Sequence, residues 1–137
     1  MSKGFAFPVR VYYEDTDAGG IVYHANYLKF AERGRTEYLR LLGYDHQKVR
    51  TEHNLILVVR HAEIDYHAPA RLDDLLEVCT EVDNIGNTSI DLKQGVFRAD
   101  RLLAALKITV VAITPDGKPL RLPPQLRQIF SSHKAAK

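Results

Sequence analysis

The spacing of apolar residues changes once along the chain, and this change restricts the possible folds more than any other feature. From Tyr27 to Leu42, apolar or small residues recur every three or four positions, which predicts one amphipathic helix. Beyond Asn54, apolar and polar residues alternate instead, which predicts β-strands. One long helix followed by successive strands favours an α+β domain in which an antiparallel sheet wraps around the helix.

Turn signals divide the second half of the chain into predicted strands, at Arg71–Asp74, Gly86–Asn87 and Ala99–Asp100. A further strand is predicted at Phe5–Tyr13, where Pro8 indicates a strand start or a sheet edge because proline lacks a backbone donor. The pair Pro123–Pro124 predicts the start of a short terminal helix. We therefore expect about five antiparallel strands, one long central helix and a short C-terminal helix.

The predicted long helix has a signal at each end. Asn26 is a plausible N-cap, and Gly43 follows the last apolar position as a stop. Gly34 is costly inside a helix. We expect that this cost is offset by a close approach of the helix to the sheet.

Length and composition indicate one globular domain, spanning residues 1–137. The formal net charge of +2, with acidic and basic residues interspersed, does not favour nucleic-acid binding. The sequence has no signal-peptide pattern and no apolar run of membrane-spanning length. Its single cysteine, Cys79, excludes an intrachain disulfide and favours a reducing compartment. We expect a cytoplasmic protein with no integral membrane segment.

Several kinds of chemistry find little support in the sequence. No serine lies in a Gly-x-Ser-x-Gly motif, and Cys79 has no histidine near it in sequence. None of the six histidines is spaced two or four residues from another, as a pair of metal ligands on a strand or helix would be. We expect no metal site.

Asp17 is the strongest catalytic candidate that the residues alone provide. It precedes the pair Gly19–Gly20, which lets a ligand approach the backbone closely, and then the predicted helix start. Unpaired amides at a helix start stabilise a developing negative charge, so a carboxylate beside them is a minimal hydrolytic site. Two alternatives stay open: Asp15 and Asp17 only cap a turn, or they form a phosphatase-type motif, for which the chain is short.

The segment Tyr12–Tyr27, which reads YYEDTDAGGIVYHANY, closely resembles the opening signature of the hotdog-fold acyl-CoA thioesterases. It looks most like the Tol-Pal system-associated branch of the 4-hydroxybenzoyl-CoA thioesterase family. The segments Val58–Tyr66 and Pro69–Asp74 match the same branch. The resemblance covers nearly the whole chain.

This resemblance implies hydrolysis of acyl-CoA to a carboxylic acid and free CoA, with no cofactor because CoA is part of the substrate. Asp17 would either attack the thioester carbonyl or activate water as a general base. Backbone amides at Tyr23 or His24 would hold the thioester oxygen. The His24 ring would bind Asp17 or the substrate, or only its amide would matter.

The resemblance also implies a site between subunits of a homodimer, formed by strand pairing and often assembled further into a homotetramer. It places the thioester near Val58, Val59 and Arg60, and Arg60 would bind phosphate or form a surface ion pair. Gly19 and Gly20 would line the site. Tyr13 and Tyr27 would shape the acyl pocket or pack in the core.

Other functions are also open. The basic segment Arg121–Lys137 could bind an acidic acyl-carrier protein, which would make the chain an interaction module with minor hydrolysis. A dehydratase of the same fold is a further alternative, which the Asp17 motif disfavours. The mid-helix residues Glu32 and Glu37 are interpreted as structural or surface groups.

Overall fold

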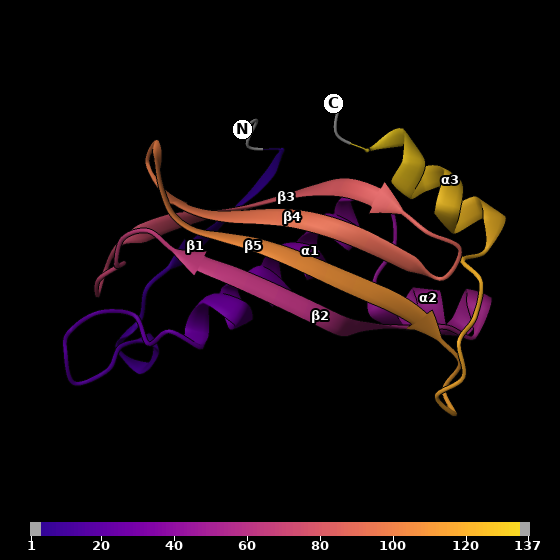
Figure 1. Cartoon of the computed structure of the whole chain (residues 1–137), viewed down its shortest axis with the longest axis horizontal. Helices are drawn as coiled ribbons and strands as arrows, with labels where there is room; N and C mark the ends of the chain where they lie inside the picture. The colour runs from indigo at the N-terminus through magenta and orange to yellow at the C-terminus, as the bar shows by residue number, and fades with distance from the viewer. Residues whose placement is uncertain (1–3, 135–137) are drawn as a thin grey trace.

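The computed structural model describes residues 4–134 (Figure 1). One antiparallel sheet has the strand order β1-β3-β4-β5-β2. The strands are β1 (Phe5–Arg10), β2 (Ile56–Tyr66), β3 (Leu75–Ile85), β4 (Ser89–Arg98) and β5 (Arg101–Ile113). The helices are α1 (Asn26–Leu41), α2 (His46–His53) and α3 (Pro124–Ser132), with a 3-10 turn, η1, at Tyr13–Asp15. The expected α+β architecture is confirmed.

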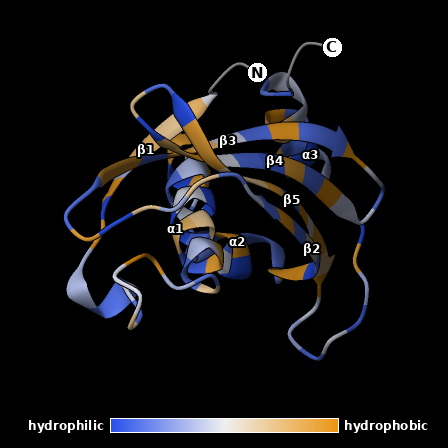
Figure 2. Cartoon of the chain, turned by 60° about the vertical axis from the view of Figure 1, so that its left-hand side comes forward, coloured by the Kyte–Doolittle hydropathy of each residue, from blue (hydrophilic) through white to orange (hydrophobic). Residues whose placement is uncertain are grey.

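The sheet curves over α1 (Figure 2), and buried apolar residues of both form one core cluster. The buried face of α1 includes Tyr27, Phe30, Ala31, Gly34 and Tyr38. Burial of each large apolar side chain contributes about 1.5–3 kcal/mol. This packing, rather than intrinsic helix propensity, therefore holds α1 under the sheet.

Gly34 lies where α1 approaches the sheet most closely. A Cβ atom placed on Gly34 would lie 2.5 Å from Cγ1 of Val78 and 3.3 Å from Oγ1 of Thr80. No side chain fits at that distance, so the expected close approach of helix and sheet is confirmed.

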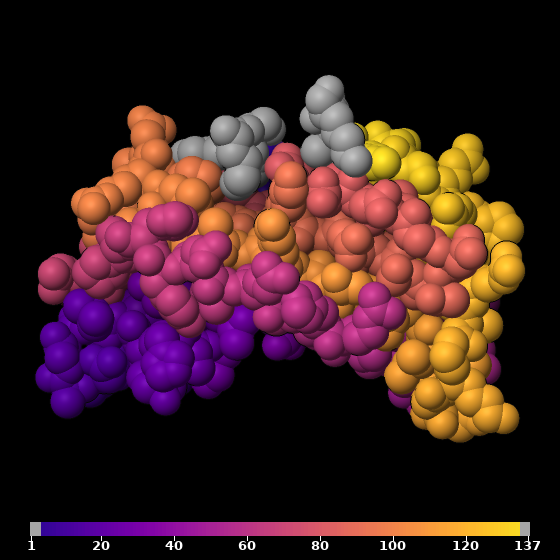
Figure 3. All heavy atoms as spheres, in the orientation of Figure 1, coloured from indigo at the N-terminus to yellow at the C-terminus, as the bar shows by residue number. Residues whose placement is uncertain are grey.

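Strands β1 and β2 form the two edges of the sheet. Pro8 pairs with Glu77 on the edge strand β1, as its missing donor predicts. On the opposite side, β2 pairs only with β5, and a register shift between Val59 and His61 interrupts that pairing. In Figure 3 the residues of β2, in magenta, run along the open lower margin of the molecule.

Three local predictions differ from the structure. Residue Ala25 occupies the N-cap position of α1, and the side chain of Asn26 instead donates to Oδ1 of Asp15 at 3.0 Å. Strand β1 ends at Arg10 rather than at Tyr13, because Tyr13 is the first residue of η1. Helix α2 was not predicted; it is eight residues long and buries only Val49.

Among residues 4–134, no helix is long and apolar enough to cross a membrane.

Candidate active site

The loop that carries Asp17 is a small hairpin. The Asp17 amide donates to the Ile21 carbonyl at 3.0 Å, and the Gly20 amide returns a bond to the Asp17 carbonyl at 3.0 Å. Gly20 makes this turn with a φ of 79°, a conformation that residues with a side chain rarely adopt. The Gly19 amide donates to Oδ1 of Asp17 at 2.8 Å. One carboxylate oxygen is thus fixed, while the side chain as a whole stays exposed.

The start of α1 leaves the His24 amide available as a donor beside this loop. The Tyr23 amide donates to the Asp15 carbonyl at 2.8 Å and is therefore already used. The His24 amide has no acceptor among the residues that the structure describes. Of the two amides predicted to hold the thioester oxygen, His24 is the one that remains free to donate.

Asp17 and His24 line the same pocket, which has a volume of about 480 Å³. The other lining residues are Ile21, Val22, Tyr27, Tyr66, His67, Ala68 and Pro69. We call this the Asp17 pocket. It joins the loop, the start of α1 and the end of β2, which lie far apart in sequence. A carboxylate and an unused amide that face one cavity can activate a nucleophile and stabilise an oxyanion.

Two tyrosines build the wall of the Asp17 pocket. The ring of Tyr66 packs edge-on against the ring of Tyr27, with centroids 5.4 Å apart, and its hydroxyl donates to the His24 carbonyl at 2.7 Å. The hydroxyl of Tyr27 accepts the Ala70 amide at 3.0 Å. Tyr27 is only 3% exposed, so it serves both the core and the pocket.

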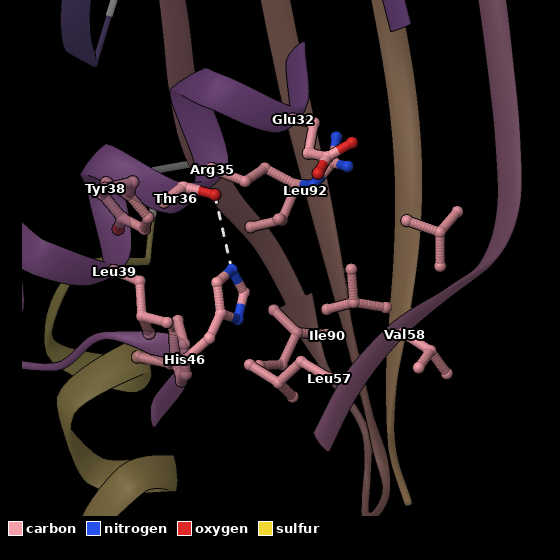
Figure 4. A pocket seen from close by; sticks show the side chains of 13 residues that line it. Glu32, Arg35, Thr36, Tyr38, Leu39, His46, Leu57, Val58, Ile90 and Leu92 are labelled. Carbon is pink, nitrogen blue, oxygen red and sulfur yellow. Dashed lines mark hydrogen bonds between the residues drawn. The ribbon is translucent and has the colours of Figure 1, made fainter. Parts of the chain in front are cut away.

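Val58 and Val59 line a second pocket, between α1 and the sheet, with a volume of about 320 Å³ (Figure 4). We call this the apolar pocket. Its interior is formed by Leu39, Leu57, Ile90, Leu92, Val110 and Phe130, with Tyr38 beside them. Its polar wall is formed by Glu32, Arg35, Thr36 and His46. Within one chain, therefore, Val58 and Val59 line a different pocket from Asp17.

A buried polar network supports the polar wall of the apolar pocket. Arg35 donates to Oε1 of Gln94 at 3.0 Å, and Gln94 in turn donates to the Ala31 carbonyl and to Thr80, each at 2.9 Å. Burial lowers the pKa of the Arg35 guanidinium, and the neighbouring Glu32 carboxylate offsets part of this effect. The guanidinium is thus held in place on the pocket wall.

Five predicted site residues line neither pocket: Tyr13, Tyr23, Arg60, Gly19 and Gly20. Gly19 and Gly20 instead form the turn that holds the Asp17 carboxylate. Tyr13 is 83% exposed, and Tyr23 is 45% exposed with its ring against that of His24. Arg60 lies at the register shift in β2 and is exposed.

Sequence reasoning missed two contributors. Tyr66 lay within a segment that matched the family, but nothing in its spacing pointed to His24. Asp15 was interpreted as a turn cap or as part of a phosphatase-type motif, yet it is 5% exposed and binds the first residue of α1.

Among the residues that the structure describes, no group of three or more His, Cys, Asp or Glu side chains could hold a metal ion. The polar side chains among the residues that line the Asp17 pocket are one carboxylate, two imidazoles and two phenols, from Asp17, His24, His67, Tyr27 and Tyr66.

Comparison with known proteins decides the family. The model of the Thioesterase superfamily matches residues 19–105. This chain belongs to the thioesterase superfamily. The match begins inside the Asp17 loop and includes all of α1, the helix whose start lines the Asp17 pocket.

Individual thioesterases agree with this assignment. The chain is 45% identical over 131 residues to the acyl-CoA thioesterase YbgC of Haemophilus influenzae, covering 95% of this chain and 96% of that protein. It is 47% identical over 121 residues to the acyl-CoA thioester hydrolase YbgC of Escherichia coli O6:H1, covering 87% and 90%. A probable thioesterase from Bartonella henselae superposes with a TM-score of 0.84 at 38% identity, covering 87% and 98%. The expected hotdog fold and the likeness to the Tol-Pal-associated branch are confirmed.

Proposed function

We propose that this thioesterase hydrolyses acyl-CoA thioesters, with Asp17 as the reacting carboxylate and the His24 amide as an oxyanion donor. The observation that carries the proposal is that Asp17 and an unused amide at the start of α1 line one pocket. The names of the YbgC relatives support an acyl-CoA substrate.

Both mechanisms open to Asp17 fit this geometry. As a general base, the carboxylate takes a proton from water while the water oxygen bonds to the carbonyl carbon. The tetrahedral oxyanion then collapses, the C–S bond breaks, and the proton passes to the CoA thiolate. As a nucleophile, a carboxylate oxygen bonds to the carbonyl carbon, the thiolate leaves, and water hydrolyses the mixed anhydride. In either case the His24 amide faces the oxygen on which negative charge develops.

The complete site forms between two copies of the chain in this proposal. Strand β2 begins at the apolar pocket, with Leu57–Val59, and ends at the Asp17 pocket, with Tyr66. If two β2 edges pair antiparallel, the start of one lies beside the end of the other. The apolar pocket of one copy then adjoins the Asp17 pocket of the second, and it would receive the acyl group there.

Thiol release from a panel of acyl-CoAs tests the proposal, with short, long and aromatic acyl groups. We expect Asp17→Asn to lower turnover by about 10²- to 10⁴-fold, because the amide can neither attack nor take a proton. Asp73→Asn is the matched control: Asp73 is exposed, and its φ of 72° is one that asparagine also adopts. Retained turnover in Asp17→Asn would remove this carboxylate from the mechanism.

The expectations about assembly, binding partners and cellular location are also proposals. Further assembly to a homotetramer, action in the cytoplasm and association with Tol-Pal proteins rest on the resemblance to the family branch. Binding of an acyl-carrier protein rests on the basic segment Arg121–Lys137, of which residues 135–137 lie outside the described part of the chain. A pull-down with acyl-carrier protein at low and raised salt tests it, and no salt-sensitive association would count against it.

A further inference from the structure

We infer that Asp15 is a positioning residue of this site: its buried carboxylate sets the distance between Asp17 and the His24 amide. This inference rests on the proposed function. It assigns a role to the first aspartate of the Asp-Thr-Asp sequence, separate from the reacting role of the second.

The contacts of Asp15 connect the two halves of the catalytic geometry. Its Oδ1 accepts the side-chain amide of Asn26, the first residue of α1, at 3.0 Å. Its Oδ2 accepts the Tyr12 amide at 2.8 Å, and its carbonyl accepts the Tyr23 amide at 2.8 Å. Asp15 is therefore bonded to the end of the β1 segment, to the residue before His24 and to the start of the helix.

The hydrogen bonds of Asp15 lie close in sequence to both proposed catalytic groups, the Asp17 carboxylate and the His24 amide. Asp17 follows Asp15 by two residues in the hairpin, and Asn26 follows His24 by two residues at the helix start. The bond between Asp15 and Asn26 thus joins the loop that carries the Asp17 carboxylate to the helix start beside the His24 amide. The Asp15 carbonyl also occupies the Tyr23 amide, so of the Tyr23 and His24 amides only that of His24 has no acceptor among the described residues.

Asp15 is 5% exposed and Asn26 is 7% exposed, and both donors to the carboxylate are neutral. A buried carboxylate is costly unless it is hydrogen-bonded, and the start of α1 adds a favourable dipole. What the carboxylate provides is two acceptors in one rigid plane, which fixes the loop and the helix at a single spacing.

An exchange of the two side chains tests this role. In Asp15→Asn, the new amide nitrogen faces the Asn26 side chain, and the two donors oppose each other unless Asn26 turns over to present its oxygen. In Asn26→Asp, two carboxylates oppose each other. In the double variant, the new amide at position 15 accepts from the Tyr12 amide through its oxygen and donates through its nitrogen to the new carboxylate at position 26. Both hydrogen bonds are thereby restored with the same total charge.

We expect Asn26→Asp to lower kcat for a short acyl-CoA by about 10- to 100-fold with little change in KM, because small displacements of catalytic groups are costly. Asp15→Asn should lower kcat less, because Asn26 can turn over and restore the hydrogen bond. We expect the double variant to recover most of kcat. Urea unfolding of all three variants shows whether the protein remains folded under assay conditions. Unchanged kcat in a folded Asn26→Asp variant, or a folded double variant as slow as Asn26→Asp, would overturn the inference. If the single variants do not fold, the folded double variant is compared with the wild type. Recovery of most of kcat supports the inference, and slow turnover overturns it.

Failure of the proposed function can be told apart from failure of this inference. Absence of thiol release from the wild type would refute the proposed hydrolysis, while the position of the His24 amide could still be followed by ¹⁵N–¹H NMR. A shift of that amide signal in Asn26→Asp and its return in the double variant would support the positioning role. An unshifted signal in Asn26→Asp would overturn it.

Discussion

Tyr66 lies at the end of the edge strand β2. Its hydroxyl donates to the carbonyl of His24, the residue whose amide is available. Burial, and to a lesser degree Tyr27, raises the pKa of the Tyr66 hydroxyl, so it remains a donor throughout the neutral range. We expect Tyr66→Phe to lower kcat by about 3- to 10-fold, since one hydrogen bond at the His24 carbonyl is lost. The shape of the pH–rate profile should not change, and steady-state kinetics across pH 6–9 measures both effects.

Tyr44→Phe is the control for this hydroxyl deletion, because Tyr44 lines neither pocket. Equal loss of activity in the two variants would contradict a specific role for the Tyr66 hydroxyl.

The carboxyl group of Asp74 should make the free energy of unfolding depend on pH in the acidic range. Burial raises the pKa of this carboxyl, but the Arg71 amide and the Arg98 guanidinium together outweigh burial and lower the pKa below its ordinary 3.8. A lowered folded-state pKa stabilises the protein above the unfolded value and loses this contribution as pH falls through the folded value. Asp74→Asn should therefore lower the urea midpoint at pH 7, and the difference should shrink below about pH 4. A constant difference down to pH 3 would refute the assignment.

Asn26 illustrates how far single residues could be predicted. Its type and place indicated an N-cap, because asparagine oxygens commonly accept amides at a helix start. Its side chain bonds instead to Asp15, a tertiary contact across eleven positions that no local pattern encodes. Asp17, Gly19, Gly20 and His24, by contrast, were predicted together because they lie within one short segment.

At the scale of secondary-structure elements, the packing of α1 on the sheet depends on the missing side chain at position 34. Gly34→Ala improves helix propensity by about 1 kcal/mol, but overpacking typically costs about 1–3 kcal/mol. With Val78 Cγ1 only 2.5 Å from the added Cβ, we expect overpacking to prevail and the free energy of unfolding to fall. Urea denaturation measures the change.

A double-mutant cycle tests whether the contact with Val78 causes the loss of stability expected in Gly34→Ala. Val78→Ala removes the obstructing methyl group, so Gly34→Ala should cost less in that background than in the wild type. Equal costs in both backgrounds would show that the clash is not with Val78.

The elements themselves were predicted unevenly. Long alternating segments and strong turn pairs predicted all five strands, because each pattern repeats over many residues. Helix α2 was not predicted, because it is short and mostly polar. Asp45, whose side chain accepts the Lys48 amide at the N-cap, is a weak sequence signal by itself.

At the scale of the whole molecule, the proposed pairing of β2 edges predicts complementation between two inactive variants. Asp17→Asn damages the Asp17 pocket, and Val58→Trp obstructs the apolar pocket. In a mixed dimer, one of the two composite sites is built from undamaged halves. After dissociation and random reassociation of equal amounts, we expect about a quarter of wild-type activity, because half of the dimers are mixed and each has one intact site.

Each variant reassociated with itself is the control and should stay inactive. A mixture that never exceeds the sum of the two variants would mean that each chain carries its own complete site.

The relation between the two pockets could not be predicted from this sequence without a relative. Residues 17 and 58 each lie in recognisable segments, but spacing along one chain carries no information about a second copy. The resemblance to the family supplied the interface, and the structure adds that the two pockets lie at opposite ends of one edge strand.

The position of β2 at an open edge has a consequence for when activity begins. If the site is composite as proposed, a newly made chain would fold completely and still hydrolyse nothing, because each of its half-sites would need a second copy. At low abundance the rate would then rise with the square of chain concentration, and dilution would silence the enzyme without unfolding it. The cellular pool of CoA esters would thus be exposed to hydrolysis only above a threshold of synthesis.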